Sequence, residues 1–199
     1  MSLERETLLQ KLETHLSGER VRHSLGVEAV ATQMAGRFGA DKEKAGIAGL
    51  MHDCAKELER EKARALGERL GIFEDVWLVA EPALWHASLG AYVAREEYGI
   101  TDTQVLSAIA SHTTGKAGMS VLDKIIYLAD YIEPGRSFEG VEVLRAYARY
   151  DLDKALLAAF ETTIRYLLQK GKVIHPQTVL ARNEAITAIH KKTNKEGIF

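Results

Sequence analysis

Residues 21–39 read VRHSLGVEAVATQMAGRFG. The apolar side chains that recur in this stretch on one helical face are Val27, Val30 and Met34. Gly39 is a typical helix end, so the pattern predicts a helix over Val21–Phe38. His23 lies on the same apolar stripe. We therefore expect one imidazole of this helix to face the protein interior.

Helical spacing recurs along the rest of the chain, interrupted by glycines and by three prolines. The further helices that we predict are one that carries Leu8, Leu12 and Leu16 and ends near Gly18, one from about Asp41 to Leu58, and others at about 61–70, 84–98, 105–112, 120–133, 141–150, 152–169 and 177–191. The candidate N-caps are Ser2, Asp41, Asp102 and Ser120. No run alternates apolar and polar residues for long, and no Asn-Gly or Asp-Gly turn joins β-branched stretches. The sequence thus predicts an all-α fold with a single domain over 1–199, a core at about 20–136 and C-terminal helices at about 141–191.

Charge and cysteine content limit the class of protein. The chain has 199 residues, with 26 Lys and Arg against 28 Asp and Glu and a formal net charge of −2. A general nucleic-acid binder usually carries a basic excess, so we expect no nucleic-acid polymer as a partner. Cys54 is the sole cysteine, and no apolar run reaches the ~18 residues of a spanning helix. These features predict a cytoplasmic protein that needs no disulfide and does not enter a membrane.

Several polar side chains are predicted to face inward from separate helical segments. Beside His23 they are His52, Asp53, His86, His112 and Asp130. Burying an imidazole or a carboxylate is costly unless it is hydrogen-bonded or bound to a metal. One such residue is most often a satisfied polar group of the core, but the whole set is easiest to satisfy around a metal ion. His15 and His190 lie among charged neighbours and are predicted at the surface.

The mixture of imidazole and carboxylate narrows the ion and its chemistry. Such ligands suit a first-row transition metal, whereas Mg²⁺ prefers oxygen ligands. A metal held in this way lowers the pKa of bound water toward ~7, and two ions ~3.5–4 Å apart stabilise both the attacking and the leaving oxygen. The set therefore favours hydrolysis of phosphate esters or anhydrides with one or two ions. Asp53 or Asp130 would orient the attacking water, and His86 or His112 would protonate the leaving oxygen.

Groups suited to phosphate follow these candidates in the sequence. We expect Lys56 to project from the same helical face as His52, one turn further along. Arg136 lies in a predicted turn, where its guanidinium can bind phosphate through two N–H groups. Thr113 and Thr114 offer hydroxyl and backbone donors. Each also has an ordinary interpretation, as a solvated helix residue for Lys56 and as a helix end for the two threonines.

The local sequences around these residues resemble a known family. They are RVRHSLGV at His23, AGLMHDCAK at His52, LWHASLGA at His86, ASHTTG at His112, LADYIEPGR at Asp130 and IHPQTVLARN at 174–183. His23, the pair His52 and Asp53, and the later Asp130 resemble the signature of HD-domain metal-dependent phosphohydrolases. The remaining strings are similar to those of bacterial symmetrical diadenosine-tetraphosphate hydrolases, over about 20–183 of the chain.

This resemblance implies an HD-type all-helical fold, hydrolysis of diadenosine tetraphosphate to two ADP, and iron or a similar divalent metal such as manganese. The metal ligands that it implies are His23, His52, Asp53 and Asp130, and the residues that it implies for a second metal or for phosphate are His86 and His112. The substrate contacts that we expect beside these two histidines are Lys56, Thr113, Thr114, Asp130, Arg136, Ile174, His175 and Asn183, of which Ile174, His175 and Asn183 would face the nucleoside.

Other functions fit the same residues. An HD phosphohydrolase acting on a deoxynucleotide or a cyclic nucleotide would differ in its products, because two ADP without ATP and AMP mark the symmetrical cut. A nucleotide-binding sensor with a structural metal site would normally have lost a ligand, whereas the set here is intact. A helical scaffold with buried histidines is the third alternative. A homodimer is a candidate assembly for any of them.

Overall fold

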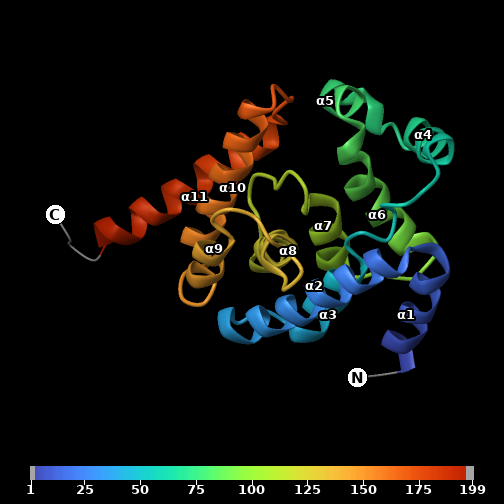
Figure 1. Ribbon diagram of the computed structural model, residues 1–199, viewed down its shortest axis with the longest axis horizontal. Helices are drawn as coiled ribbons and strands as arrows, with labels where there is room; N and C mark the ends of the chain where they lie inside the picture. The colour runs from blue at the N-terminus through green and yellow to red at the C-terminus, as the bar shows by residue number, and fades with distance from the viewer. Residues whose placement is uncertain (1–2, 196–199) are drawn as a thin grey trace.

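The computed structural model describes residues 3–195, with side chains for 5–194. Within these residues the chain forms eleven α-helices and two short 3₁₀ helices, joined by turns and loops (Figure 1). The α-helices are α1 (Leu3–His15), α2 (Gly18–Phe38), α3 (Lys42–Met51), α4 (Arg60–Arg69), α5 (Val76–Ala80), α6 (Trp85–Glu96), α7 (Thr103–Ser111), α8 (Val121–Ile132), α9 (Val141–Tyr147), α10 (Leu152–Gln169) and α11 (Pro176–Lys195). The 3₁₀ helices are η1 (Ile72–Glu74) and η2 (Pro82–Leu84). Since residues 3–195 contain no strand, the all-α prediction is confirmed. The candidate N-cap Ser2 lies outside the described residues.

A glycine contact lets α2 and α3 approach closely. A Cβ on Gly49 of α3 would lie 2.9 Å from the Cα of Glu28 and 3.1 Å from the carbonyl oxygen of Val27. Both atoms belong to the backbone of α2, so a side chain at this position would force the two helices apart. The close packing places His23, near the start of α2, beside His52 at the end of α3.

The helix α8 runs through the middle of the molecule and packs against α2, α3, α7 and α10 (Figure 1). Its residues 125–129 are fully buried. A capping box formed by Ser120 and Asp123 begins the helix, and it ends at Ile132, before Pro134, as predicted. The buried surface of α8 thus holds Asp130, in the last turn of the helix, at a fixed position beside α2.

The helix predicted from about Asp41 to Leu58 ends at Met51, so this prediction is wrong for its last part. Residues 52–57 form successive turns, in which the Cys54 N–H donates to the carbonyl oxygen of Met51. In a continuous helix, adjacent side chains diverge by about 100°. The turns instead direct both His52 and Asp53 into the interior, where both side chains are buried.

Two other parts of the chain differ from the predictions. Gly18 begins α2 instead of ending the first helix, because the Ser17 hydroxyl accepts from the Arg20 N–H as an N-cap. Between Gly71 and Trp85 the chain forms η1, α5 and η2, which are too short to show a periodic pattern. The other predicted helices begin and end within a few residues of the observed ones. Among the described helices, none is both long and apolar enough to cross a bilayer.

Gly49→Ala should destabilise the protein, because the new methyl group meets the backbone of α2 and not a flexible side chain. Overpacking of this kind costs about 1–3 kcal/mol. We expect the urea midpoint of unfolding to fall accordingly, with an unchanged slope. Gly18→Ala is the matched control, since the nearest atom to its Cβ would be 3.7 Å away in the side chain of Arg22. Equal midpoints for the two variants would contradict the close packing of α2 on α3.

Candidate metal centre

Four imidazoles lie in a row in the interior. His23 is near the start of α2, His86 is in the first turn of α6, and His52 and His112 directly follow α3 and α7. Neighbouring ring centroids are 5.1 Å apart for His23 and His52, 4.9 Å for His52 and His112, and 5.0 Å for His112 and His86. The structure therefore brings together the four histidines that the sequence predicts to face inward. The two predicted at the surface, His15 and His190, are exposed.

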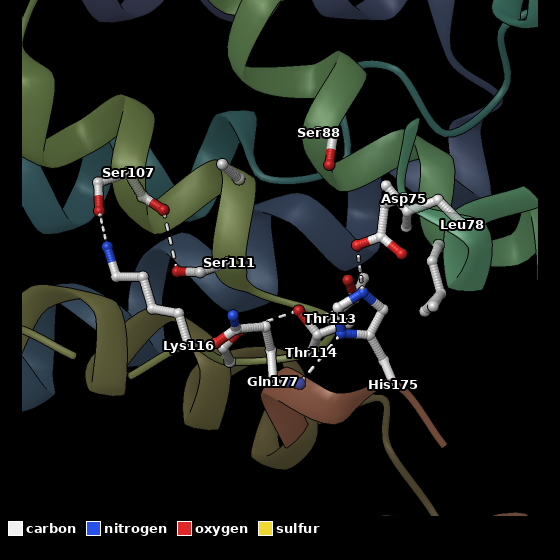
Figure 2. A pocket seen from close by; sticks show the side chains of 13 residues that line it. Asp75, Leu78, Ser88, Ser107, Ser111, Thr113, Thr114, Lys116, His175 and Gln177 are labelled. Atoms are coloured by element: carbon white, nitrogen blue, oxygen red, sulfur yellow. Dashed lines mark hydrogen bonds and ion pairs between the residues drawn. The ribbon is translucent and has the colours of Figure 1, made fainter. Parts of the chain in front are cut away.

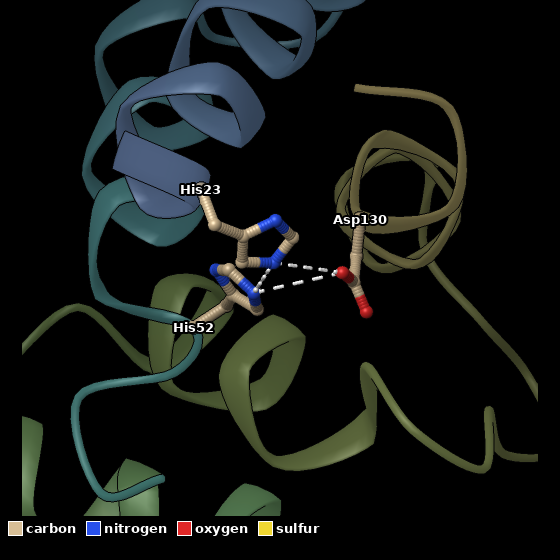
Figure 3. A group of neighbouring side chains, drawn as sticks. All are labelled: His23, His52 and Asp130. Atoms are coloured by element: carbon tan, nitrogen blue, oxygen red, sulfur yellow. Dashed lines mark hydrogen bonds and ion pairs between the residues drawn. The ribbon is translucent and has the colours of Figure 1, made fainter. Parts of the chain in front are cut away.

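At one end of this row, His23 and His52 converge with two carboxylates. His23 Nε2 lies 3.2 Å from His52 Nε2 and 3.0 Å from Asp130 Oδ1 (Figure 3). Asp53 Oδ2 lies 3.4 Å from His52 Nε2. These four residues are the ones predicted as metal ligands, and the structure places their nitrogen and oxygen atoms around one point.

The other end of the row forms a second group of donors that shares Asp53. His86 Nε2 and His112 Nε2 are 3.1 Å apart. Asp53 Oδ1 lies 3.2 Å from His86 Nε2 and 3.5 Å from His112 Nε2. Asp53 thus points one carboxylate oxygen toward each group, which is the arrangement of a bridging ligand.

In three of the imidazoles, a hydrogen bond at Nδ1, which points away from the centre, sets the protonation of Nε2, which points toward it. In His52, His86 and His112, Nδ1 lies 2.8 Å from the backbone carbonyl oxygen three residues earlier. A carbonyl oxygen can only accept, so each Nδ1 carries the hydrogen. In its neutral form, each of these rings therefore turns the lone pair of Nε2 toward the centre.

When these three rings are neutral, their Nε2 lone pairs face the carboxylate oxygens, and these atoms repel one another unless a cation or a proton lies between them. Asp53 Oδ1 is buried and has no hydrogen-bond partner among the described residues. Metal-binding histidines characteristically donate their other N–H to a carbonyl or carboxylate. The side chains present, which offer imidazole nitrogens and carboxylate oxygens, therefore fit a divalent transition metal.

The local electrostatics keep the two aspartates charged. Burial alone would raise the pKa of Asp53, but His52, His112 and His86 together hold it well below the usual range of a carboxyl group. Burial alone would raise the pKa of Asp130 too, but its pKa is lowered, chiefly by the hydrogen bond with His23. Burial lowers the pKa of His86 to about 4, outweighing the attraction of the nearby carboxylate of Asp53. At neutral pH the carboxylates are charged and His86 is neutral. Burial alone would lower the pKa of His52, but Asp53 and Asp130 raise it, so a metal would compete with a proton for His52 Nε2.

Two contacts of the centre were not predicted from the sequence. Glu133 is buried, its Oε1 lies 3.1 Å from His23 Nδ1, and its Oε2 accepts from the Gly135 N–H at 2.6 Å. Arg20 donates from Nη1 to Asp53 Oδ2 at 2.8 Å. The signal that could have found them is their spacing, because Arg20 and Glu133 each lie three residues from a predicted ligand, at one turn of helix.

Lys56 does not share a helical face with His52, because α3 has already ended before it, and this prediction is wrong. The turns nevertheless bring it to the centre from another side. Its Nζ lies 3.2 Å from His86 Nε2. Lys56 therefore adjoins the second group of donors.

Arg136 lies at the edge of the first group. It pairs through Nη2 with Asp130 and donates from Nε to the carbonyl oxygen of the same residue at 2.8 Å. Its side chain is 39% exposed, so the guanidinium also faces solvent.

A cavity of about 400 Å³ lies between α6, α7 and the start of α11 (Figure 2). The predicted substrate contacts that line it are Thr113, Thr114 and His175. His175 Nε2 lies 3.0 Å from Asp75 Oδ2, so this ion pair links the start of α11 to the start of α5 (Figure 2). Ile174 is half-buried beside it, whereas Asn183 is exposed on α11 and is not among the residues that line the cavity.

Comparison with known proteins agrees with this site. Residues 20–135 match the HD domain family. The chain belongs to this family, and the resemblance seen in its motifs is confirmed.

Its relatives within the family are more specific. The chain is 41% identical to "Bis(5'-nucleosyl)-tetraphosphatase, symmetrical" of Halalkalibacterium halodurans, over 92% of this chain and 98% of that protein. It is 40% identical to the protein of the same name from Bacillus subtilis, over 91% of this chain and 97% of that protein. A crystal structure from Clostridium acetobutylicum, described as a "predicted HD superfamily hydrolase involved in NAD metabolism", has a TM-score of 0.89 and 44% identity, over 92% of this chain and 97% of that chain.

Glu133→Gln should weaken metal binding, because it removes the carboxylate that holds the His23 ring in its orientation. Loss of such a partner typically lowers metal affinity about 10–100-fold. The measurement is the dissociation constant of the metal, obtained by competition with a chelator. Glu142→Gln is the matched control, since Glu142 forms only an exposed ion pair on α9. An unchanged dissociation constant in Glu133→Gln would show that Glu133 does not support His23.

Proposed function

We propose that this protein hydrolyses diadenosine tetraphosphate symmetrically, yielding two ADP. The main support is the convergence of the inward-facing histidines and aspartates on one centre, in a chain 40% and 41% identical to symmetrical bis(5'-nucleosyl)-tetraphosphatases over most of its length. In diadenosine tetraphosphate, phosphoanhydride bonds join the four phosphates that link the two adenosines. A centre of imidazoles and carboxylates suits the hydrolysis of such bonds.

The ion that we propose is iron, with manganese or another divalent transition metal as the alternative. When bound, such an ion lowers the pKa of water and neutralises charge on phosphate. The residues that would hold one ion are His23, His52, Asp53 and Asp130. His86 and His112, with the second oxygen of Asp53, offer a position for another. If one ion binds per chain, His86 and His112 would instead contact phosphate together with Lys56.

Cationic side chains around the centre suit a polyphosphate. The chain as a whole has a net charge of −2, so the attraction must be local. Lys56 lies on the His86 side of the centre and Arg136 on the Asp130 side. With a phosphate contact at each side, the central phosphates would lie along the row of imidazoles. Catalysis would then rest on positioning and charge stabilisation.

Two proton-handling roles belong to the same proposal. Asp53 or Asp130, both charged at neutral pH, would orient the attacking water. Of the two histidines predicted as the acid, His86 has a pKa lowered to about 4 by burial and carries no proton on Nε2 at neutral pH, so His112 would give the proton to the leaving oxygen if it is not itself a metal ligand. Counting the ions bound per chain therefore decides whether His112 is free to act as the acid.

The cavity in Figure 2 is the proposed site for one nucleoside of the substrate. Its volume of about 400 Å³ lies within the usual range for small-molecule sites. Thr113 and Thr114 directly follow His112 and supply hydroxyl groups to its lining. His175 would contact the nucleoside from α11, with Ile174 and Asn183 as neighbouring predicted contacts.

We place this activity in the cytoplasm. The sole cysteine, Cys54, is buried, and burial raises the pKa of its thiol to about 12, so the thiol stays protonated and poorly reactive. The fold thus needs no oxidising compartment. The homodimer and the single-domain boundaries stay predictions.

The test of this function is chromatographic analysis of the products formed from diadenosine tetraphosphate. We expect ADP alone, loss of turnover with a chelator, and its return when a divalent metal is added. Asp53→Ala should lose both metal and turnover while its circular dichroism stays helical, because Asp53 faces both groups of donors. Formation of ATP and AMP, or turnover only of deoxynucleotides or cyclic nucleotides, would contradict the proposal. Wild-type turnover by a folded Asp53→Ala protein would contradict the assigned centre.

Lys56→Ala and Arg136→Ala should weaken substrate use, because each removes a charged donor from the phosphates. A hydrogen bond to a charged group contributes about 1.5–3 kcal/mol, so we expect kcat/KM to fall by about 10–150-fold. Bound metal is measured in the same samples and should remain. Lys62→Ala is the matched control, since Lys62 is an exposed residue of α4. Unchanged kinetics in both variants would remove these residues from phosphate binding.

A further inference from the structure

A second cavity, of about 470 Å³, lies at the opposite end of the imidazole row from His86, and His23 forms part of its wall. The charged residues that line it with Pro134 are Glu19, Arg20, Arg22, Glu133 and Arg136. They come from the first turns of α2 and from the turn after α8. This cavity, which we call the arginine cavity, shares no lining residue with the cavity in Figure 2.

The charges of the arginine cavity favour an anion. Arg20 and Arg136 are held by the two aspartates of the centre. Arg22 makes no ion pair within the described residues, and Arg20 Nε is buried there without a hydrogen-bond partner. The carboxylate of Glu133 is already engaged by His23 and the Gly135 N–H. The lining holds three arginines against two glutamates, of which Glu19 is exposed, and Arg22 offers the cavity a guanidinium that is unpaired in the described part of the chain and suits an anion.

The position of the arginine cavity links it to the reaction centre. His23, a proposed metal ligand, lies in its wall, and so does Arg136 at the exposed edge of Asp130. An anion bound there would therefore lie beside His23 and Arg136. The buried second group, with His112 and His86, lies toward the far end of the row.

We propose that the arginine cavity binds one ADP half of the substrate and that Arg22 recognises the phosphates of that half. This inference rests on the proposed function. The other half would occupy the cavity in Figure 2, so that one nucleotide lies toward each end of the imidazole row. The central anhydride would then lie at the metal centre between them. Equal products follow from this placement, because each side of the centre holds one nucleoside and two phosphates.

The experiment measures how many ADP molecules bind to the metal-loaded, full-length protein, by isothermal titration calorimetry. We expect two per chain for the wild type and one for Arg22→Glu. With diadenosine tetraphosphate, Arg22→Glu should raise KM at least about tenfold, the equivalent of about 1.4 kcal/mol, while kcat stays within about twofold. Arg22→Ala should act in the same direction with a smaller effect. Arg22 is exposed, so both variants are expected to fold.

Arg149→Glu is the matched control. Arg149 is exposed and lines a neighbouring cavity of about 370 Å³ that meets the arginine cavity only at Pro134. It should bind two ADP with an unchanged KM. One ADP per wild-type chain, two per Arg22→Glu chain, or loss of an ADP in Arg149→Glu would each overturn the proposal.

The proposed function and this inference are tested by different measurements. The reaction is tested by the products that the same wild-type preparation forms from diadenosine tetraphosphate, and the arginine cavity by the number of ADP molecules bound. A preparation that binds two ADP, one of them through Arg22, but does not form ADP would retain the arginine cavity and refute the reaction. A preparation that forms ADP but binds only one would do the reverse.

Discussion

The site depends on a short hydrogen bond between each of three buried imidazoles and the protein backbone. In His52, His86 and His112, Nδ1 donates to the carbonyl oxygen three residues earlier. The partner lies within the same turn of chain, so the bond forms wherever the local backbone forms. It satisfies one nitrogen, sets the tautomer and turns the lone pair of Nε2 toward the centre. The Nε2 atoms of these three rings then converge with the oxygens of Asp53 and Asp130, and this group of atoms is suited to binding a cation.

The end of α3 gives this centre its bridging carboxylate. Because the helix stops at Met51 and turns follow, His52 and Asp53 both face inward although they are neighbours in sequence. The carboxylate of Asp53 can then face one pair of imidazoles with each oxygen. The same burial leaves Asp53 Oδ1 without a hydrogen-bond partner among the described residues. Such a site is costly to the empty protein, and an ion that binds only the folded chain stabilises it.

Sequence reasoning succeeded where the physical cause is local. The helix over 152–169 was placed at the correct residues, because its apolar periodicity lies within it and Gly171 follows it closely. It failed for α5 and the two 3₁₀ helices, which are too short for an apolar pattern to repeat within them. It also missed Glu133, because the contact with His23 joins residues of two different helices. Lys56 was predicted near the site for a wrong reason. Its Nζ contacts His86 because turns follow Met51, and not because α3 continues to it.

The sequence by itself determined the kind of elements, the inward-facing histidines and aspartates, and through its motifs the family and its metal chemistry. These follow from residue types and from periods of a few residues, which are readable along one chain. Tertiary structure alone decided that Asp53 lies between two groups of donors, that Arg20 and Glu133 support them, and that His23 lines a cavity separate from the one beside Thr113. These features depend on how α2, α3, α6, α7 and α8 pack against one another. Packing is decided by side-chain volumes, and by glycine contacts such as that of Gly49, across distances that no local pattern records.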